Sequence, residues 1–218
     1  MKKNFYLMID TETAGTLEEP LVYDIGFAVV DKQGNVYAAY SFVVSEVFYG
    51  MKDLMQTAYY AEKIPNYLID IDQGTRRVAR FFYIWSFIRA LIKEYHITAC
   101  IAHNMRFDNN ALNRTARVLS ENQHKYFFPY GVKLWCTLAM ARSIMTYSSV
   151  YKQWCAHYGF TLKNGTPRMT AEVLYRFITN NPTFEEKHTG IEDVMIEKDI
   201  FAYLCRKHKK MQRTYWKE

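Results

Sequence analysis

The sequence has few of the residues that mark small secreted or fibrous proteins. Four cysteines, nine glycines and five prolines occur in 218 residues, and no two cysteines form a CxxC pair. This composition excludes a disulfide-stapled peptide, a collagen-like repeat and a largely disordered chain. Half of the residues are hydrophobic and 17% are aromatic. The sequence therefore predicts a folded globular chain, with residues 1–218 forming a single domain.

Long apolar runs are also missing. The longest candidate, residues 81–92, is interrupted by Ser86 and Arg89, so no membrane span is predicted. The apolar stretch behind the basic N-terminus is cut by Asp10 and Glu12, which is unlike a signal peptide. We therefore expect a cytoplasmic protein, in the host cytoplasm if it is phage-encoded, with its cysteines reduced.

Acidic residues are outnumbered by basic ones. The chain has 28 Lys and Arg against 22 Asp and Glu, a net charge of +6, which permits a polyanionic partner. Much of this charge lies in a basic C-terminal helix end, residues 206–218, where aromatic residues are interleaved. This segment could follow the phosphates of a single nucleic-acid strand. It could equally be a solvated helix end whose cations suit the helix dipole.

Hydrophobic patterning predicts an α/β chain. Short apolar runs predict strands over residues 5–9, 22–30, 36–44, 97–102 and 132–136, the first three forming an antiparallel meander. Helical spacing predicts helices over residues 77–94, 108–120, 138–145, 150–158, 170–179 and 191–208. Residues 45–75 show no clear pattern beyond a short helix near 54–63. The order of elements predicts a mixed sheet with helices packed on its faces.

Two carboxylates end the first predicted strand. Asp10 and Glu12 are two residues apart in an extended chain, so their side chains point to the same side with backbones ~7 Å apart. Ligands of open α/β sheets bind at the carboxyl ends of strands. The pair could therefore hold one cation, or could be a polar strand end before the turn at Gly15.

Two further acids occupy comparable places. Asp108 ends the segment HNMRFD, residues 103–108, directly after the strand predicted at 97–102. An Asp in that position is also a common helix N-cap. Asp193 lies in the first turn of the last predicted helix, five residues after His188, where an acid favours the helix dipole. Each acid alone has a structural explanation, but their shared setting indicates a common site.

Together, the strand-end DxE, the strand-end HNxxFD and the helix-start HxxxxD resemble the three motifs of the DEDDh family of 3′–5′ exonucleases. That family includes proofreading exonuclease subunits, oligoribonucleases and ribonuclease T. The resemblance spans residues 10–193 and implies a ribonuclease H-like fold with a five-stranded sheet. It also implies that two divalent cations, Mg²⁺ or Mn²⁺, are bound by four acids: Asp10, Glu12, Asp108 and Asp193.

The resemblance also assigns other residues. His188 is implied as the general base, because the tyrosine type of the family would need Tyr where this chain has Thr189. Thr11, Thr13 and Asn104 match positions near the scissile nucleotide. Asp24 stands where family members often have Glu before an Ile-Gly pair. It could hold a metal-associated water, hold a backbone group, or be a strand-edge charge.

The function implied by the resemblance is removal of mononucleotides from 3′ ends of DNA or RNA, with single-stranded ends as the expected partner. The alternatives are an RNA-trimming or oligoribonuclease-like enzyme and a catalytically silent nucleic-acid-binding module of the same fold. A separate polymerase or other replication protein is the expected partner for any coupling to replication.

Overall fold

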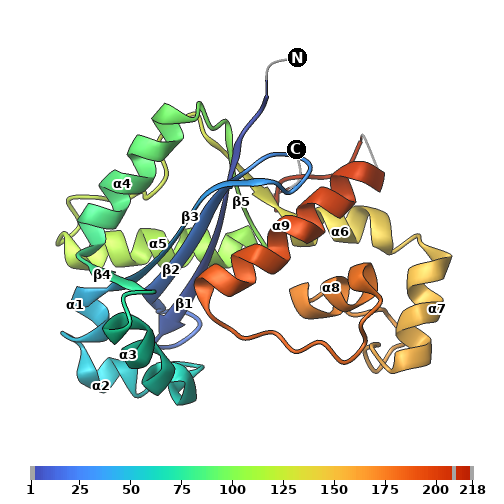
Figure 1. Ribbon diagram of the computed structural model, residues 1–218, viewed down its shortest axis with the longest axis horizontal. Coiled ribbons are helices and arrows are strands. Elements are labelled where there is room, and N and C mark those ends of the chain that lie inside the picture. Colours follow the sequence, from blue (N-terminus) through green and yellow to red (C-terminus); the bar gives the residue numbers. More distant parts are fainter. Residues whose placement is uncertain (1–2, 208–209, 217–218) are drawn as a thin grey trace.

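A mixed sheet organises the computed structural model, which describes residues 3–207 and 210–216 (Figure 1). Within them the sheet has six strands in the order β4-β3-β2-β1-β5-β6. The strands are β1 (Tyr6–Ala14), β2 (Leu21–Val30), β3 (Val36–Val44), β4 (Arg77–Ala79), β5 (Ala99–Ala102) and β6 (Lys133–Cys136). The first three form the expected antiparallel meander. The others add parallel to it, β4 beside β3, β5 beside β1 and β6 beside β5.

The expected number of five strands is wrong, because β4 forms where the sequence predicts the start of a helix. Arg80 has an extended backbone, so the helix α4 begins only at Phe81 and ends at Glu94. Val78, which fits the helical pattern, is 39% exposed on the edge strand. A strand of three residues is too short to show alternation, and its pairing with β3 depends on a distant segment.

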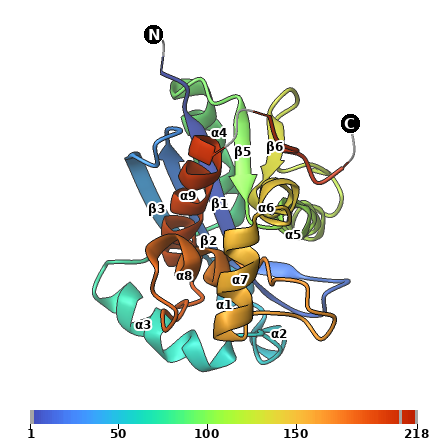
Figure 2. The same cartoon turned by 90° about the vertical axis from the view of Figure 1, so that its right-hand side faces the viewer.

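Helices cover both faces of the sheet (Figure 2). One face packs against α4 and α5 (Met105–Leu119). The other packs against α6 (Thr137–Met145), α7 (Ser149–Tyr158), α8 (Ala171–Thr179) and α9 (Gly190–Lys207). Along β1, Leu7 and Ile9 belong to the first core, and Tyr6 and Met8 to the second. This alternation directs even-numbered side chains of β1 towards α9.

Residues 45–75 form several short helices instead of one near 54–63. They are α1 (Ser45–Phe48), α2 (Lys52–Met55), the 3₁₀ helix η1 (Ala61–Lys63) and α3 (Ile64–Asp72). Pro65 lies in the first turn of α3, where its missing N–H costs nothing. The buried ring of Tyr67 packs edge-on against Tyr23 of β2. The segment is therefore folded onto the sheet by its aromatic side chains.

In the described part of the chain, the predicted basic helix end is helical to Lys207. Residues 210–216 are irregular and return to the sheet, where the Arg213 carbonyl accepts a hydrogen bond from the Cys136 N–H at 2.6 Å. The Arg213 guanidinium lies 4.7 Å from the centre of the Trp135 ring. Positions 208–209 and 217–218 of the tail lie outside the described residues. Among the described helices, none is long and apolar enough to cross a membrane.

Candidate metal centre and active site

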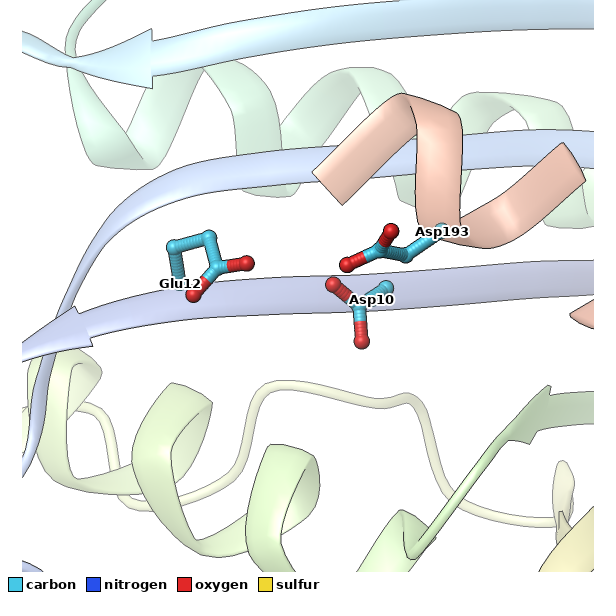
Figure 3. Close-up of side chains that lie close together, drawn as sticks. All are labelled: Asp10, Glu12 and Asp193. Atoms are coloured by element: carbon cyan, nitrogen blue, oxygen red, sulfur yellow. The ribbon is translucent and has the colours of Figure 1, made fainter. Parts of the chain in front are cut away.

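Three carboxylates converge at the carboxyl half of β1. Asp10 and Glu12 project from β1 towards α9, whose first turn carries Asp193 (Figure 3). One carboxylate oxygen from each of the three lies within 4.8 Å of the others. The parallel neighbour β5 ends at Ala102, and its last pairing with β1 is Ile101 with Met8. The side chain of Asp10 therefore lies beyond the end of β5, where the sheet leaves room for a ligand.

Asp108 lies in the first turn of α5 and is only 2% exposed. The alternative that it caps this helix is wrong, because α5 begins at Met105 after Asn104, whose backbone is left-handed. The Thr11 hydroxyl donates a hydrogen bond of 2.9 Å to Asp108 Oδ1. Asp108 lines the same cleft as the three converging acids, although it is not part of the group within 4.8 Å.

His188 immediately precedes α9 and has a positive φ of 56°. Its ring stacks on Tyr60, with centroids 4.3 Å apart and planes 8° from parallel, and its Nδ1 is 3.9 Å from Glu186 Oε2. Burial lowers the pKa of His188, which favours the neutral imidazole. Both His188 and Tyr60 line the cleft with the acids.

Of the three expected substrate-binding residues, two line the cleft and one does not. Thr11 and Asn104 line the cleft, and Asn104 is exposed there. Thr13 is half-buried, follows a register shift in the β1–β2 ladder, and is not among the described residues that line the cleft. The structure therefore brings Thr11 and Asn104 close to the acids but leaves Thr13 outside the cleft.

The cleft extends well beyond the acids and has a volume of about 1040 Å³. Its far wall comes from α6, α8 and the segment 159–170. Arg142 and Arg168 are exposed on this wall, and Phe160 and Leu162 add apolar surface beside them. The site thus has an acidic wall and a wall that combines basic and apolar groups.

The acids strongly affect one another's ionisation. Burial, followed by the charge of Asp193, raises the pKa of Glu12 to about 9. Burial, followed by Glu186, raises the pKa of Asp193 to about 8, and burial raises the pKa of Asp108 to about 7. Asp193 Oδ1 is buried without a hydrogen-bond partner in the described part of the chain. Crowded hard oxygen donors with an unpartnered oxygen fit a divalent cation.

These shifts predict how pH affects the metal-free protein. The carboxyls bind protons more tightly in the folded state than in the unfolded state. Their pKa values are about 7 to 9 in the folded state for Asp108, Asp193 and Glu12, against ~4 in the unfolded chain. Stability in EDTA should therefore be highest at low pH and fall as pH rises through this range. Thermal denaturation between pH 5 and 9 measures the trend, and Glu12→Gln should flatten it. A melting temperature that rises across the window would contradict the prediction.

Sequence reasoning missed several residues of the cleft, among them Tyr60 and Glu197. Tyr60 lies directly before η1, and its contact with His188 spans more than a hundred residues, so no local pattern could reveal it. Glu197 lies four residues after Asp193 on α9. That spacing places both side chains on one helix face, which is a signal present in the sequence.

Asp24 holds the start of α9 in place. The side chain is fully buried, and its Oδ2 accepts hydrogen bonds from Arg76 Nη1 at 2.9 Å, from the Tyr67 hydroxyl at 2.7 Å and from the Gly190 N–H at 3.0 Å. Of the three roles open to it from the sequence, the structure shows that it holds a backbone group. Because Gly190 begins the helix that carries Asp193, this network positions one of the converging acids.

A contact between two glycines brings α9 onto the sheet. A Cβ atom added to Gly26 of β2 would lie 2.0 Å from the carbonyl carbon of Gly190, far inside any allowed contact. Only glycine therefore fits at position 26 without displacing α9. The first turn of α9 lies directly on the main chain of β2, beside Asp10 and Glu12.

Asp24→Asn should lower the free energy of unfolding by about 1–3 kcal/mol, because the guanidinium of Arg76, only 4% exposed, loses its buried counter-charge but keeps Asp70 Oδ2 at 3.2 Å. Urea denaturation measures the change. Glu19→Gln is the control, since the Glu19–Arg114 pair is largely exposed and its loss should cost under about 1 kcal/mol. Equal effects of the two substitutions would show that Asp24 has no such role.

Comparisons with known proteins agree on the fold. No family model and no curated protein matches the sequence. The structure titled "3′-end specific recognition of histone mRNA stem-loop by 3′-exonuclease" matches with a TM-score of 0.63 and 10% identity, over 98% of this chain and 86% of that chain. A zinc-bound complex of E. coli ExoI with single-stranded DNA matches with a TM-score of 0.52 and 15% identity, over 95% of this chain but only 41% of that one. The chain therefore has the ribonuclease H-like α/β fold of these exonucleases, with six strands in its sheet.

Proposed function

We propose that the chain is a metal-dependent 3′–5′ exonuclease that hydrolyses phosphodiester bonds of DNA or RNA. One observation carries the proposal. The carboxylates of Asp10, Glu12 and Asp193 meet within 4.8 Å, in a cleft that Asp108 and His188 also line. Four acids can hold two cations for phosphodiester hydrolysis, and His188 would supply a general base.

The four acids would hold two divalent cations. Carboxylate oxygens are hard donors, which favours Mg²⁺ or Mn²⁺. When bound, the cations would neutralise charge on the phosphate and activate a water molecule. Asp10 and Asp193 approach from β1 and from α9, and Asp108 from α5. Donors from separate elements leave coordination positions open for a substrate phosphate.

His188 would remove a proton from the attacking water. The oxygen of that water forms a bond to phosphorus, the bond from phosphorus to the 3′ oxygen breaks, and the 3′ oxygen of the shortened strand takes a proton from solvent. The product is a nucleoside 5′-monophosphate. The lowered pKa of His188, caused by burial, keeps the imidazole neutral and able to accept a proton near neutral pH. Asn104 and Thr11, which line the cleft, would contact the terminal nucleotide.

The far wall of the cleft suits the rest of a nucleic-acid strand. Arg142 and Arg168 are exposed there and could neutralise backbone phosphates. Phe160 on the same wall is an aromatic surface on which a base could stack. These contacts use the backbone and base faces, so they suit both DNA and RNA.

The test is degradation of end-labelled single-stranded DNA, duplex DNA and RNA, with Mg²⁺ and with Mn²⁺. We expect stepwise shortening from the 3′ end, inhibition by EDTA, and protection of a strand that carries a 3′ phosphate. Undiminished degradation in EDTA, or equal digestion of blocked and free ends, would overturn the mechanism. Binding of all three nucleic acids without degradation would favour the catalytically silent alternative. Activity confined to RNA would favour the RNA-trimming alternative.

A further inference from the structure

A second carboxylate on α9 faces the same cleft as Asp193. Glu197 lies one helical turn after Asp193 and lines the cleft with Asp10 and Asp108. Glu197 is only 2% exposed. The spacing of four residues puts both carboxylates on the side of α9 that faces β1.

The Glu197 carboxylate accepts a hydrogen bond from the backbone N–H of His103, but its other oxygen has no partner among the described residues that would explain its burial. Within residues 3–207 and 210–216, its Oε2 has no hydrogen-bond donor, and no Lys or Arg there forms an ion pair with it. A buried carboxylate is strongly unfavourable unless it is paired or coordinates a metal. A well-packed apolar side chain would be the ordinary occupant of this position.

The charges that do surround Glu197 are those of the candidate metal centre. Glu197 lines the same cleft as Asp10 and Asp108, although it is not part of the group of carboxylates within 4.8 Å, and after burial its charge is the largest cause of the raised pKa of Asp10. Asp108 and Asp193 are in turn the main charged neighbours of Glu197. All of these neighbours carry the same sign, so a cation among them would compensate Glu197 together with the other acids.

We propose that Glu197 is a fifth carboxylate ligand of the metal centre, acting on the side of the site formed by Asp10 and Asp108. The inference rests on the proposed function, because it takes a divalent cation to be bound there. Glu197 lies outside the DxE, HNxxFD and HxxxxD motifs. Its unpartnered oxygen, its burial and its position in the cleft are the observations that support it.

Glu197→Gln tests this role, because it removes the charge while keeping the shape of the side chain. Calorimetric titration of the full chain with Mn²⁺, without nucleic acid, should show a loss of affinity of about 10-fold or more, since even residues that only orient metal ligands affect affinity by ~10–100-fold. The stabilisation that Mn²⁺ gives in thermal denaturation should shrink in parallel. Glu197→Met should behave in the same way and serves as a second variant if the first folds poorly.

Glu192→Gln is the matched control. Glu192 lies beside Asp193 on α9, but its carboxylate is bound by Lys187 Nζ at 2.6 Å and by the Thr189 hydroxyl at 2.7 Å. The Glu192→Gln substitution removes the same charge from the same helix. Mn²⁺ affinity should stay within about threefold of the unmodified chain, because surface charges act weakly. A comparable loss in both variants would mean that Glu197 acts through space and is not a ligand.

The outcomes separate this inference from the proposed function. If the unmodified chain binds Mn²⁺ and Glu197→Gln binds it equally well, Glu197 is a protonated, structural side chain and only the present inference fails. If the unmodified chain does not bind Mn²⁺ or Mg²⁺, both the proposed function and the inference fail. Reduced Mn²⁺ affinity in Glu197→Gln and Glu197→Met, with the control unchanged, supports Glu197 as a ligand.

Discussion

Asp10→Asn should reduce exonuclease activity by at least ~10²-fold, because the loss of a direct ligand should exceed the ~10–100-fold effects of groups that only orient ligands. The same change should raise the melting temperature of the metal-free protein. Asp10 is surrounded by carboxylates that, after burial, raise its pKa well above the usual range, and removing one of these like charges relieves their repulsion. Rates on a labelled oligonucleotide and thermal denaturation in EDTA measure the two effects.

Asp53→Asn is the control for this prediction, because Asp53 is exposed on α2, outside the cleft. It should change neither the rate nor the melting temperature appreciably. An Asp10→Asn protein that degrades the oligonucleotide at the original rate would exclude Asp10 from the chemistry. An inactive variant that is also less stable in EDTA would instead point to misfolding.

His188→Ala should lower the turnover rate by ~10²–10⁴-fold, the usual contribution of a general base, with little change in Mn²⁺ affinity. Asp193→Ala should lower both, because Asp193 belongs to the group of carboxylates within 4.8 Å of one another. Even if both variants are inactive, their Mn²⁺ binding isotherms should differ. Calorimetry with Mn²⁺ together with single-turnover rates distinguishes a base from a ligand.

Imidazole in the buffer provides a further check on His188. The ring is stacked on Tyr60 and its side chain is 32% exposed, so His188→Ala should open a space beside Tyr60 that a free imidazole molecule can enter. Partial recovery of the rate by added imidazole would support a proton-transfer role. Equal losses of Mn²⁺ affinity in His188→Ala and Asp193→Ala would show that the histidine is a ligand.

The strand pattern of the sequence predicts the meander well and the first strand only in part. The third strand is predicted at 36–44 and observed at Val36–Val44. The first strand is predicted from the apolar run at residues 5–9 to end with Asp10 and Glu12, but β1 continues to Ala14. These residues pair with β2 through their backbones, and backbone pairing does not require an apolar side chain. The apolar run therefore stops where the candidate site begins.

The candidate site could be predicted where its geometry is local and not where it is tertiary. The spacing of Asp10 and Glu12 requires them to share a side of an extended strand, and they do. The stacking of Tyr60 on His188 and the hydrogen bond from Thr11 to Asp108 join segments far apart in the chain. Neither contact has a periodicity, so only the folded chain reveals them.

The role of Asp24 illustrates the same limit. Its position before Ile25 and Gly26 gives no indication of which groups it binds. Its partners, Tyr67, Arg76 and Gly190, come from three other segments. Burial of a charged residue in the centre of a sheet implies a compensating partner, but the sequence cannot say which residue supplies it.

The direct contact between Gly26 and Gly190 has a consequence for how such a molecule could change during evolution or in the laboratory. With main chain lying against main chain, the separation between β2 and the first turn of α9 is independent of the size of nearby side chains. The far wall of the cleft has no such constraint, since Leu162 and Arg168 are exposed on the segment 159–170. Substitutions on that wall can therefore alter which nucleic-acid strands would fit the cleft, while the position of Asp193 relative to the sheet stays fixed.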